Sequence, residues 1–140
     1  MIKFNKKIEY LDKDIKIKYR FFNKSKNDIG YVIIRFNNLI NFWDMEYKVE
    51  ADFQKMGYGT KIVSATLEDI FVKSSDKFKP NSISIQIAEN NLPSIKLAKK
   101  LGFEITKSPY GHSGKITKQN FLKTRRKLCE GLGQQQNLKL

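Results

Sequence analysis

Residues 42–60, FWDMEYKVEADFQKMGYGT, place a β-type run directly before a turn with two glycines and a helix. The apolar and β-branched content of residues 42–50 favours a strand. Gly57 and Gly59 allow the backbone to tighten and to approach a ligand without a Cβ clash. The helix that follows directs unpaired N–H groups and the positive end of its dipole towards the turn. The stretch therefore predicts a phosphate-binding turn between a strand and a helix.

A second informative block lies at residues 91–104 and reads NLPSIKLAKKLGFE. This block and the earlier Gln54-x-x-Gly57-x-Gly59 together resemble the GNAT superfamily of N-acetyltransferases. In that family the first motif binds the pyrophosphate of acetyl-CoA, and the second marks the next helix and the strand after it. The resemblance covers roughly residues 30–128, and two blocks in order are more specific than either alone.

The resemblance implies an α/β (α+β) fold with a mixed, mostly antiparallel central sheet, a splayed strand pair and flanking helices. Hydrophobic periodicity agrees with it. The pattern predicts strands at residues 2–10, 15–22, 30–36, 42–50, 83–87, 103–106 and 116–128, and helices at residues 59–72 and 91–102. A loop at residues 107–114 is expected between the last two strands.

One region departs from the family. GNAT domains commonly place one or two helices between the first strands, as a wall over the acceptor, but residues 11–29 carry strand alternation. We therefore expect the N-terminal helices to be reduced or absent. An open acceptor side suits a polypeptide or another macromolecule, although a partner subunit in a homodimer could equally close it.

Length and composition limit the possibilities. The 140 residues predict a single GNAT-like domain over residues 1–129 and a polar, disordered tail over residues 130–140. No run of eighteen apolar residues is present, so we expect a cytoplasmic protein without a membrane partner. Cys129 is the single cysteine and His112 the single histidine, which leaves neither an internal disulfide nor an ordinary zinc site.

The net charge of +13 is unevenly distributed along the chain. Residues 1–28 carry +5, residues 29–106 carry +1 and residues 107–140 carry +7. The basic flanks could attract an acidic protein surface or a nucleic acid backbone. A simpler interpretation is a solvated surface in a chain rich in Lys, Asn and Ile, and both interpretations stay open.

The resemblance also implies a set of residues that bind acetyl-CoA. The exposed edge of the strand at residues 47–51 can pair with the amides of the pantetheine arm, and a backbone N–H near Val49 can polarise the thioester carbonyl. Asn91 could contact the arm, but an N-cap explains it equally well. The expected set is Tyr47, Val49, Gln54, Lys55, Met56, Gly57, Tyr58, Gly59, Thr60, Asn91 and Ser94. No metal is required.

Amine acetylation needs a group that accepts a proton. Asp44 and Glu46 project from one face of the strand at residues 42–50, while Trp43, Met45 and Tyr47 project from the other. Glu46, and then Asp44, is the candidate base. The alternative is that both carboxylates are simply solvated or paired with lysine.

The family often carries a tyrosine that protonates the leaving thiolate, and this chain has Ala98 at that position. Tyr110 or His112, between the last two strands, could replace it, although both residue types are common in ordinary loops.

The leading hypothesis is therefore an acyltransferase that moves an acetyl group from acetyl-CoA to an amine by direct attack in a ternary complex. A protein or peptide amine and an RNA-linked amine are the two competing acceptors. The rival from another class is a non-catalytic acyl-CoA-binding or basic nucleic-acid-binding module on the same fold.

Overall fold

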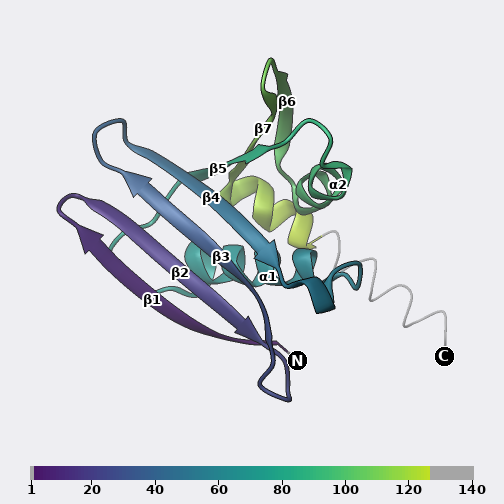
Figure 1. The fold of residues 1–140 in the computed structure, drawn as a ribbon. Coiled ribbons are helices and arrows are strands. Elements are labelled where there is room, and N and C mark those ends of the chain that lie inside the picture. The colour runs from purple at the N-terminus through teal and green to yellow at the C-terminus, as the bar shows by residue number, and fades with distance from the viewer. Residues whose placement is uncertain (1, 127–140) are drawn as a thin grey trace.

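The structure is a computed structural model that describes residues 2–126. Within these residues, seven strands form one sheet in the order β1-β2-β3-β4-β5-β7-β6 (Figure 1). The strands are β1 (Lys3–Leu11), β2 (Asp14–Phe22), β3 (Asp28–Asn37), β4 (Phe42–Val49), β5 (Ser82–Ile87), β6 (Glu104–Ser108) and β7 (Gly111–Thr117). The helical segments are the 3-10 turn η1 (Ala51–Phe53), α1 (Tyr58–Glu68), the π-helical turn η2 (Asp69–Lys73) and α2 (Leu92–Leu101). The predicted fold class is confirmed.

Strands β1 to β4 form an antiparallel meander with short connections. Asp12 and Lys13 alone separate β1 from β2, and Asp12 adopts the left-handed conformation that such a tight turn needs (φ 58°). No helix occurs between residues 2 and 50, so the expected loss of the N-terminal helices is confirmed for the described part of the chain.

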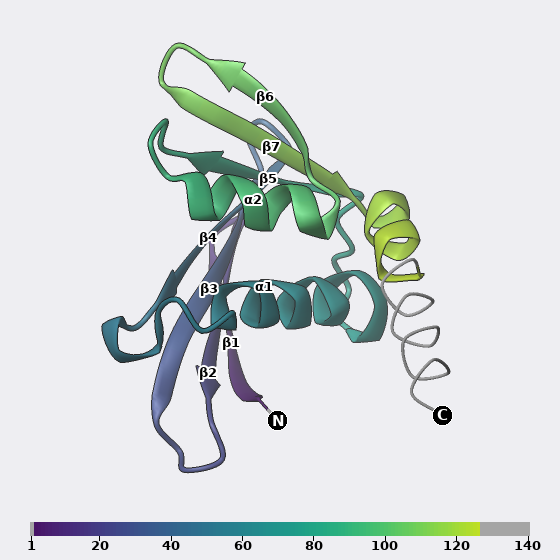
Figure 2. The same ribbon diagram turned by 90° about the vertical axis from the view of Figure 1, so that its right-hand side faces the viewer.

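Both long helices lie on one face of the sheet, α1 beside the β1–β4 group and α2 beside β5 to β7 (Figure 2). Alternation along the strands turns Ile17, Val32 and Met45 towards them, and this face is buried. In α1 the apolar residues recur at helical spacing and complete the same core. The opposite face of β1 to β4 carries no helix in the described residues, and we call it the outer face.

The end of the chain differs from the sequence prediction. A strand over residues 116–128 is wrong, because β7 ends at Thr117 and residues 118–126 are helical. The Thr117 side chain caps this helix by accepting a hydrogen bond from the Asn120 backbone N–H at 3.1 Å. Phe121 is buried against Phe71, which fixes the helix on the core. Leu128, Cys129 and the predicted tail lie outside the described residues.

The loop predicted at residues 107–114 is also wrong in extent. β6 continues to Ser108 and β7 begins at Gly111, so only Pro109 and Tyr110 form the turn. The Ser108 hydroxyl donates to the Gly111 carbonyl at 3.2 Å and closes the hairpin. A local side-chain bond of this kind replaces the longer loop that the glycines and proline suggested.

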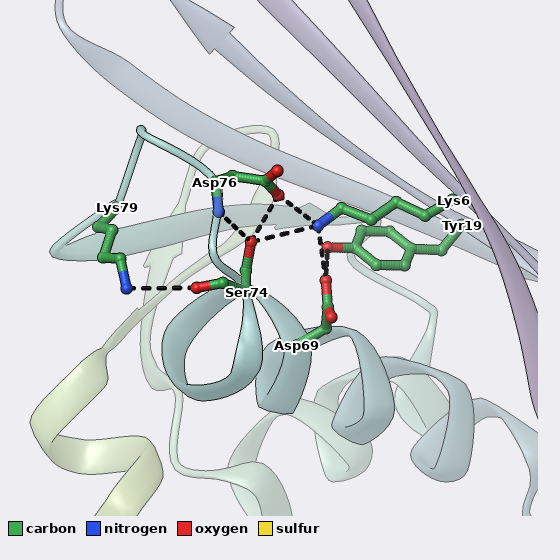
Figure 3. A network of polar contacts seen from close by, with 6 residues as sticks. All are labelled: Lys6, Tyr19, Asp69, Ser74, Asp76 and Lys79. Carbon is green, nitrogen blue, oxygen red and sulfur yellow. Dashed lines mark hydrogen bonds and ion pairs between the residues drawn. The ribbon is translucent and has the colours of Figure 1, made fainter.

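A polar network ties the edge of the sheet to the end of α1 (Figure 3). Lys6 Nζ on β1 lies 2.8 Å from Asp69 Oδ2 and 2.5 Å from Asp76 Oδ2. The buried Tyr19 hydroxyl donates to the same Asp69 oxygen at 2.7 Å. Burial and the Asp69 carboxylate raise the pKa of Tyr19, so its hydroxyl stays a donor. The network therefore fastens β1 and β2 to the segment that leads into β5.

Within residues 2–126 no helix combines the length and the apolar character needed to span a membrane.

Candidate active site

The sheet is open between β4 and β5. These two strands are parallel and pair only at Asp44 with Ser84 and at Met45 with Ile85. Beyond Met45 the strands diverge, so the two groups of strands spread apart towards the start of α1 (Figure 2). The splayed pair expected from the resemblance is present.

Backbone groups of β4 face this opening. The Glu50 N–H donates to the Ile29 carbonyl at 2.8 Å, so this opposed pair is a hydrogen-bonded one. Hydrogen-bonded and non-hydrogen-bonded pairs alternate in an antiparallel ladder. Tyr47 and Val49 are therefore in non-hydrogen-bonded pairs with β3 and point their N–H and C=O groups towards β5. Apart from the Val49 carbonyl, which accepts from the Gln54 side chain, these groups have no strand partner among the described residues and can pair with an extended ligand.

The turn after β4 is held in shape by its own residues. The Gln54 side chain donates to the Val49 carbonyl at 3.0 Å and closes the turn against the end of the strand. Lys55 and Gly57 both have positive φ angles, 64° and 80°. A Cβ on Gly57 would meet no atom within 4 Å, so this glycine faces open space. Glycine is used here because of the backbone conformation and the free approach to the turn.

A groove of about 610 Å³ lies between the end of β4, the turn and the N-terminal halves of α1 and α2, and we call it the cradle groove. Its lining includes ten of the eleven residues expected to bind the cofactor: Tyr47, Val49, Gln54, Lys55, Gly57, Tyr58, Gly59, Thr60, Asn91 and Ser94. Met56 does not line the groove and is 62% exposed. Residues separated by the whole of α1 and β5 thus meet in one site.

Several lining residues were not singled out from the sequence. They are Lys48, Phe53, Pro93, Lys96, Leu97 and Lys100. For Lys96 and Lys100 the signal was present but weak, because a lysine on a helix is usually only solvated. Lys61 and Lys99 fit that description, since neither lines the groove.

The cradle groove is suited to an anionic ligand. Lys48, Lys55, Lys96 and Lys100 line it, and its lining includes no carboxylate. The N-cap of α1 is Gly57, and no side chain in the described residues caps this helix. The first-turn N–H groups are therefore available to a ligand, at the positive end of the helix dipole.

Gly59 sets the distance between α1 and α2. A Cβ at this position would lie 3.1 Å from Leu97 Cδ1 and 3.5 Å from the Tyr47 ring. The Tyr47 hydroxyl in turn lies 2.6 Å from the Ser94 Oγ, which joins β4 to α2 across the groove. The second glycine of the motif thus serves packing, while Gly57 serves the turn.

Asn91 has a structural partner. Its side-chain oxygen accepts the Ser94 backbone N–H at 3.2 Å, which makes Asn91 the N-cap of α2. Both residues also line the cradle groove. The capping bond explains Asn91 without a ligand, and its place in the lining leaves the cofactor role as a prediction.

The two candidate bases lie on the outer face, in different surroundings. Glu46 is exposed and pairs with Arg35 at 3.0 Å. Asp44 is half-buried, and its Oδ1 is buried without a hydrogen-bond partner among residues 2–126. Burial raises the pKa of Asp44, the charge of Glu46 adds to this rise, and Arg35 opposes it. Asp44 has the properties of a weak base more clearly than Glu46 does.

The residues considered for the leaving group lie away from the cradle groove. Tyr110 is at the tip of the β6–β7 hairpin and is 96% exposed. His112 pairs with Ile87 on β5, and its Nδ1 is buried without a partner in the described residues. Ala98 is fully buried on α2, where it is part of the core. None of the three lines the cradle groove.

Comparison with known protein families agrees with this geometry. The model of the family described as acetyltransferase (GNAT) domain matches residues 3–104. The comparison with curated protein sequences finds no match.

The fold is similar to that of solved acetyltransferases. The spermidine N-acetyltransferase from Vibrio cholerae in complex with CoA and spermine has a TM-score of 0.64 at 16% identity, over 76% of this chain and 68% of that chain. A chimera of this enzyme with hSSAT gives 0.64 at 16% identity, over 76% and 69%. The Vibrio cholerae spermidine/spermine enzyme with manganese ions gives 0.63 at 16% identity, over 77% and 68%. Likeness at this level of identity shows a shared fold.

Proposed function

This chain belongs to the GNAT acetyltransferase family, whose model matches residues 3–104, and from that membership we propose that the cradle groove binds acetyl-CoA and that a protein or peptide amine binds on the outer face. The family activity makes the chain an N-acetyltransferase, which transfers an acetyl group from acetyl-CoA to an amine. The observation that carries the proposal is the cradle groove itself, a carboxylate-free groove at an uncapped helix N-terminus.

The phosphate end of acetyl-CoA fits the turn. Backbone N–H groups from Gly57 to Thr60 converge at the start of α1 and bind oxygen anions in the way that glycine-rich turns do. Lys55, Lys96 and Lys100 add positive charge around them. A Cβ-free Gly57 leaves the approach open. Gln54 acts indirectly in this proposal, because it holds the turn against Val49.

The pantetheine arm fits the edge of β4. Tyr47 and Val49 offer backbone donors and acceptors towards the gap with β5, as an edge strand offers them to a peptide. When bound, acetyl-CoA supplies an acyl group activated as a thioester. The Val49 N–H is the donor that we propose for its carbonyl, and one such donor is typically worth about 3 kcal/mol in the transition state.

Asp44 is the base that we favour. It lies five residues along β4 from Val49, about 17 Å, so we propose that water molecules relay the proton to it. A lysine side chain titrates near ~10.4 and an α-amino group near ~7.8, so an amine acceptor arrives mostly protonated and must lose a proton. A half-buried carboxylate with a raised pKa accepts a proton more readily than a solvated one. Glu46 remains the second candidate, and its carboxylate pairs with Arg35 at 3.0 Å.

Loss of the thiolate does not require a strong acid. A thiol with a pKa near ~8.5 lies only about 2 kcal/mol from leaving as the anion at neutral pH. Ala98 is therefore compatible with activity. Tyr110 stays a prediction as a proton donor, and its exposed place at a hairpin tip makes it dependent on a bound acceptor. Direct attack in a ternary complex is the kinetic scheme that we propose.

The acceptor class follows from what the outer face lacks. No helix covers this face in residues 2–126, so it leaves room for a macromolecule. The related fold that was solved with spermine belongs to a polyamine enzyme. A polycation is a poor fit to a chain with a net charge of +13, because like charges repel.

A nucleic-acid-linked amine is the second candidate. Lys16 and Lys18 on the outer face have no ion-pair partner within the described residues, and Lys18 Nζ lies 5.1 Å from the centre of the Tyr31 ring. Cations beside an aromatic ring also occur in sites for single-stranded nucleic acid. Acceptor binding that weakens steeply with salt would favour this candidate, and a flat response would favour a peptide.

The direct test combines binding and turnover. Calorimetry measures the affinity of the cradle groove for acetyl-CoA. Release of free thiol with a panel of peptides, amines and charged tRNA measures acetyl transfer. We expect binding and turnover with at least one peptide. Tight binding without turnover on any acceptor would instead support a non-catalytic acyl-CoA-binding module. The single-domain extent over residues 1–129, a homodimer and a cytoplasmic location stay predictions.

A further inference from the structure

The side chain of Tyr47 lines the cradle groove and ends in a hydroxyl that the proposed function leaves without a role. Tyr47 is half-buried, and its ring packs against the core on the helix-bearing face of the sheet. The hydroxyl lies 2.6 Å from Ser94 Oγ in the first turn of α2. Ser94 is only 8% exposed, so this contact is shielded from bulk water. A phenol group thus stands in the wall of the groove, between β4 and α2.

The Tyr47 ring leans along β4 towards Val49. A Cβ placed on Gly59 would lie 3.5 Å from Tyr47 Cε2 and 3.7 Å from Val49 Cγ2. The edge of the ring and the Val49 side chain therefore approach the same point. The Val49 N–H is the donor proposed for the thioester carbonyl, and a carbonyl bound there brings its own sulfur to this part of the groove.

The sulfur that leaves in acetyl transfer needs a proton or a hydrogen bond at this place. A thiol titrates near ~8.5 and a phenol near ~10, so the two acidities are similar. A phenol therefore donates a hydrogen bond to a developing thiolate, and its proton can follow at little cost.

Among the described residues that line the groove, no other side chain combines this acidity with this position. The four lysines of the lining are all exposed. Tyr58 begins α1, and its ring packs edge-on against Phe53 with 5.6 Å between the ring centres. Thr60 and Ser94 are alcohols, which are much weaker acids than a phenol. Tyr47 is therefore the proton donor that the lining offers beside Val49.

The start of α2 supports a charge on the Tyr47 oxygen. Asn91 caps this ten-residue helix, and Ser94 lies in its first turn. The positive end of the helix dipole is therefore close to the phenol. When the Ser94 hydroxyl donates to the Tyr47 oxygen, the Tyr47 proton is free to point into the groove. The same bond stabilises negative charge that develops on the Tyr47 oxygen.

We propose that Tyr47 is the catalytic acid that protonates the leaving thiolate, and that Ser94 is a positioning residue that holds its hydroxyl. The inference rests on the proposed function and adds a proton donor to it. The amine nitrogen forms its bond to the carbonyl carbon and loses its extra proton to the base. As the C–S bond breaks, the electron pair stays on sulfur, and Tyr47 gives sulfur its hydroxyl proton. The Tyr47 oxygen recovers a proton from water after the thiol has left.

The first test measures the pKa of the CoA thiol in the bound state and requires no acceptor. A thiolate absorbs ultraviolet light more strongly than a thiol, so a pH titration of the CoA complex gives this pKa. The same titration with desulfo-CoA, which has no sulfur, is subtracted to remove the absorbance of the tyrosines.

The expected shifts differ between three variants. Tyr47→Phe should raise the pKa of the bound thiol by about one unit, because a hydrogen bond to the thiolate is lost. Ser94→Ala should raise it less, since the phenol remains but is held less firmly. Tyr10→Phe is the control and should leave it unchanged, because Tyr10 is 67% exposed and does not line the groove.

Turnover gives an independent readout. Tyr47→Phe keeps the ring and removes only the hydroxyl, so calorimetry should show nearly unchanged affinity for acetyl-CoA. In thiol-release assays kcat should fall roughly tenfold to a hundredfold, at the low end for a general acid because a thiolate is a good leaving group. The KM for the acceptor should stay within about twofold.

The outcomes separate this inference from the proposed function. If CoA and acetyl-CoA bind but Tyr47→Phe leaves the pKa of the bound thiol unchanged, the hydroxyl only ties β4 to α2 and the inference is overturned. A shift in Tyr110→Phe without one in Tyr47→Phe would assign the proton donor to the hairpin tip instead. Ser94→Ala repeats the test in a second variant, and a pKa that stayed the same or fell would also count against Tyr47. Failure of the wild type to bind either ligand would overturn the proposed function and this inference together.

Discussion

Two pockets lie at opposite ends of β4 and are built from different parts of the chain: the cradle groove, and a pocket of about 380 Å³ at the tips of the β1–β2 and β3–β4 hairpins, the hairpin-tip pocket. Main-chain conformation makes the first: a left-handed Gly57, an uncapped helix start and the free edge of a strand. Side chains make the second, from four strands and the turn between β3 and β4. A ligand that is the same throughout a family can be bound by backbone groups, whereas a ligand that differs between members requires side chains. The comparison therefore predicts that substitutions at one end of β4 impair the function of that end and leave the other end unchanged.

The largest effect is expected from the carboxylate between the pockets. Asp44→Asn keeps the shape but removes the proton acceptor, so kcat/KM should fall by about 10² to 10⁴ while acetyl-CoA affinity is retained. Steady-state thiol release and calorimetry measure the two quantities. Glu46→Gln should lower kcat/KM much less. If Glu46→Gln lowered kcat/KM more than Asp44→Asn does, Glu46 would be the base.

The same residue predicts a pH dependence. The raised pKa of Asp44, to which burial and Glu46 contribute and which Arg35 opposes, means that the active carboxylate form is lost at a higher pH than for an ordinary aspartate. Activity should therefore fall on the acid side as pH drops through that raised pKa. Profiles of kcat/KM for the wild type and Asp44→Asn check this, and an unchanged acid limb in the variant would contradict it.

The next effect concerns the other end of β4. Gly57→Glu puts a carboxylate where an anion is expected and strains a backbone at φ 80°, so acetyl-CoA affinity should fall about a hundredfold. Gly57→Ala is the matched control, because its Cβ would meet open space and adds only the backbone strain. Unchanged affinity in Gly57→Glu would remove the cradle assignment.

A site remote from both pockets gives a smaller, purely structural effect. Lys6→Met leaves Asp69 and Asp76 without their shared cation and should lower the free energy of unfolding by about 2 kcal/mol. Urea unfolding measures it, and Lys7→Met, in an exposed pair with Glu9, is the control. The hydrogen bond from Lys6 lowers the pKa of Asp76, so this stabilisation is present above the ordinary value of 3.8 and is lost as pH falls through the lowered one. A stability difference that persisted in strong acid would contradict the ion-pair explanation.

The smallest effect separates a cap from a ligand contact. Asn91→Ala should cost about 1 kcal/mol of stability through loss of the α2 N-cap. Asn91→Ser restores a cap through its hydroxyl, adds no charge and removes the side-chain amide. If Asn91 only caps the helix, Ser restores stability and acetyl-CoA affinity together. If stability alone returns, Asn91 contacts the cofactor.

Much of the cradle groove could be predicted from the sequence. Gln54, Gly57 and Gly59 are local signals with direct conformational meaning, and ten of the eleven expected cofactor residues line one groove. Met56 was included because it lies within the motif, and its outward side chain depends on the turn geometry. The helix at residues 118–126 was missed because Phe121 and Leu122 are its only apolar residues, which gives no helical periodicity, and the Thr117 to Asn120 cap was the competing signal.

The hairpin-tip pocket could not be predicted in the same way. Leu11, Arg35 and Ile40 come together only through strand register and the hydrogen bond between the two tips. Exposed apolar residues in turns, such as Leu39 and Ile40, give no periodic pattern that a sequence alone would assign to a site. Asp44 was considered as a base, but its burial depends on neighbours that are distant in the chain.

The short pairing between β4 and β5 also has a consequence for hydrogen exchange. Strand β4 pairs with β3 along its length and with β5 only at Asp44 and Met45. The amides of Tyr47 and Val49 therefore face the opening and not a neighbouring strand. These two amides should exchange with deuterated water faster than those of Met45, and they should slow when acetyl-CoA occupies the gap. Hydrogen exchange at these two amides therefore reports whether acetyl-CoA is bound, and it can be measured without an acceptor.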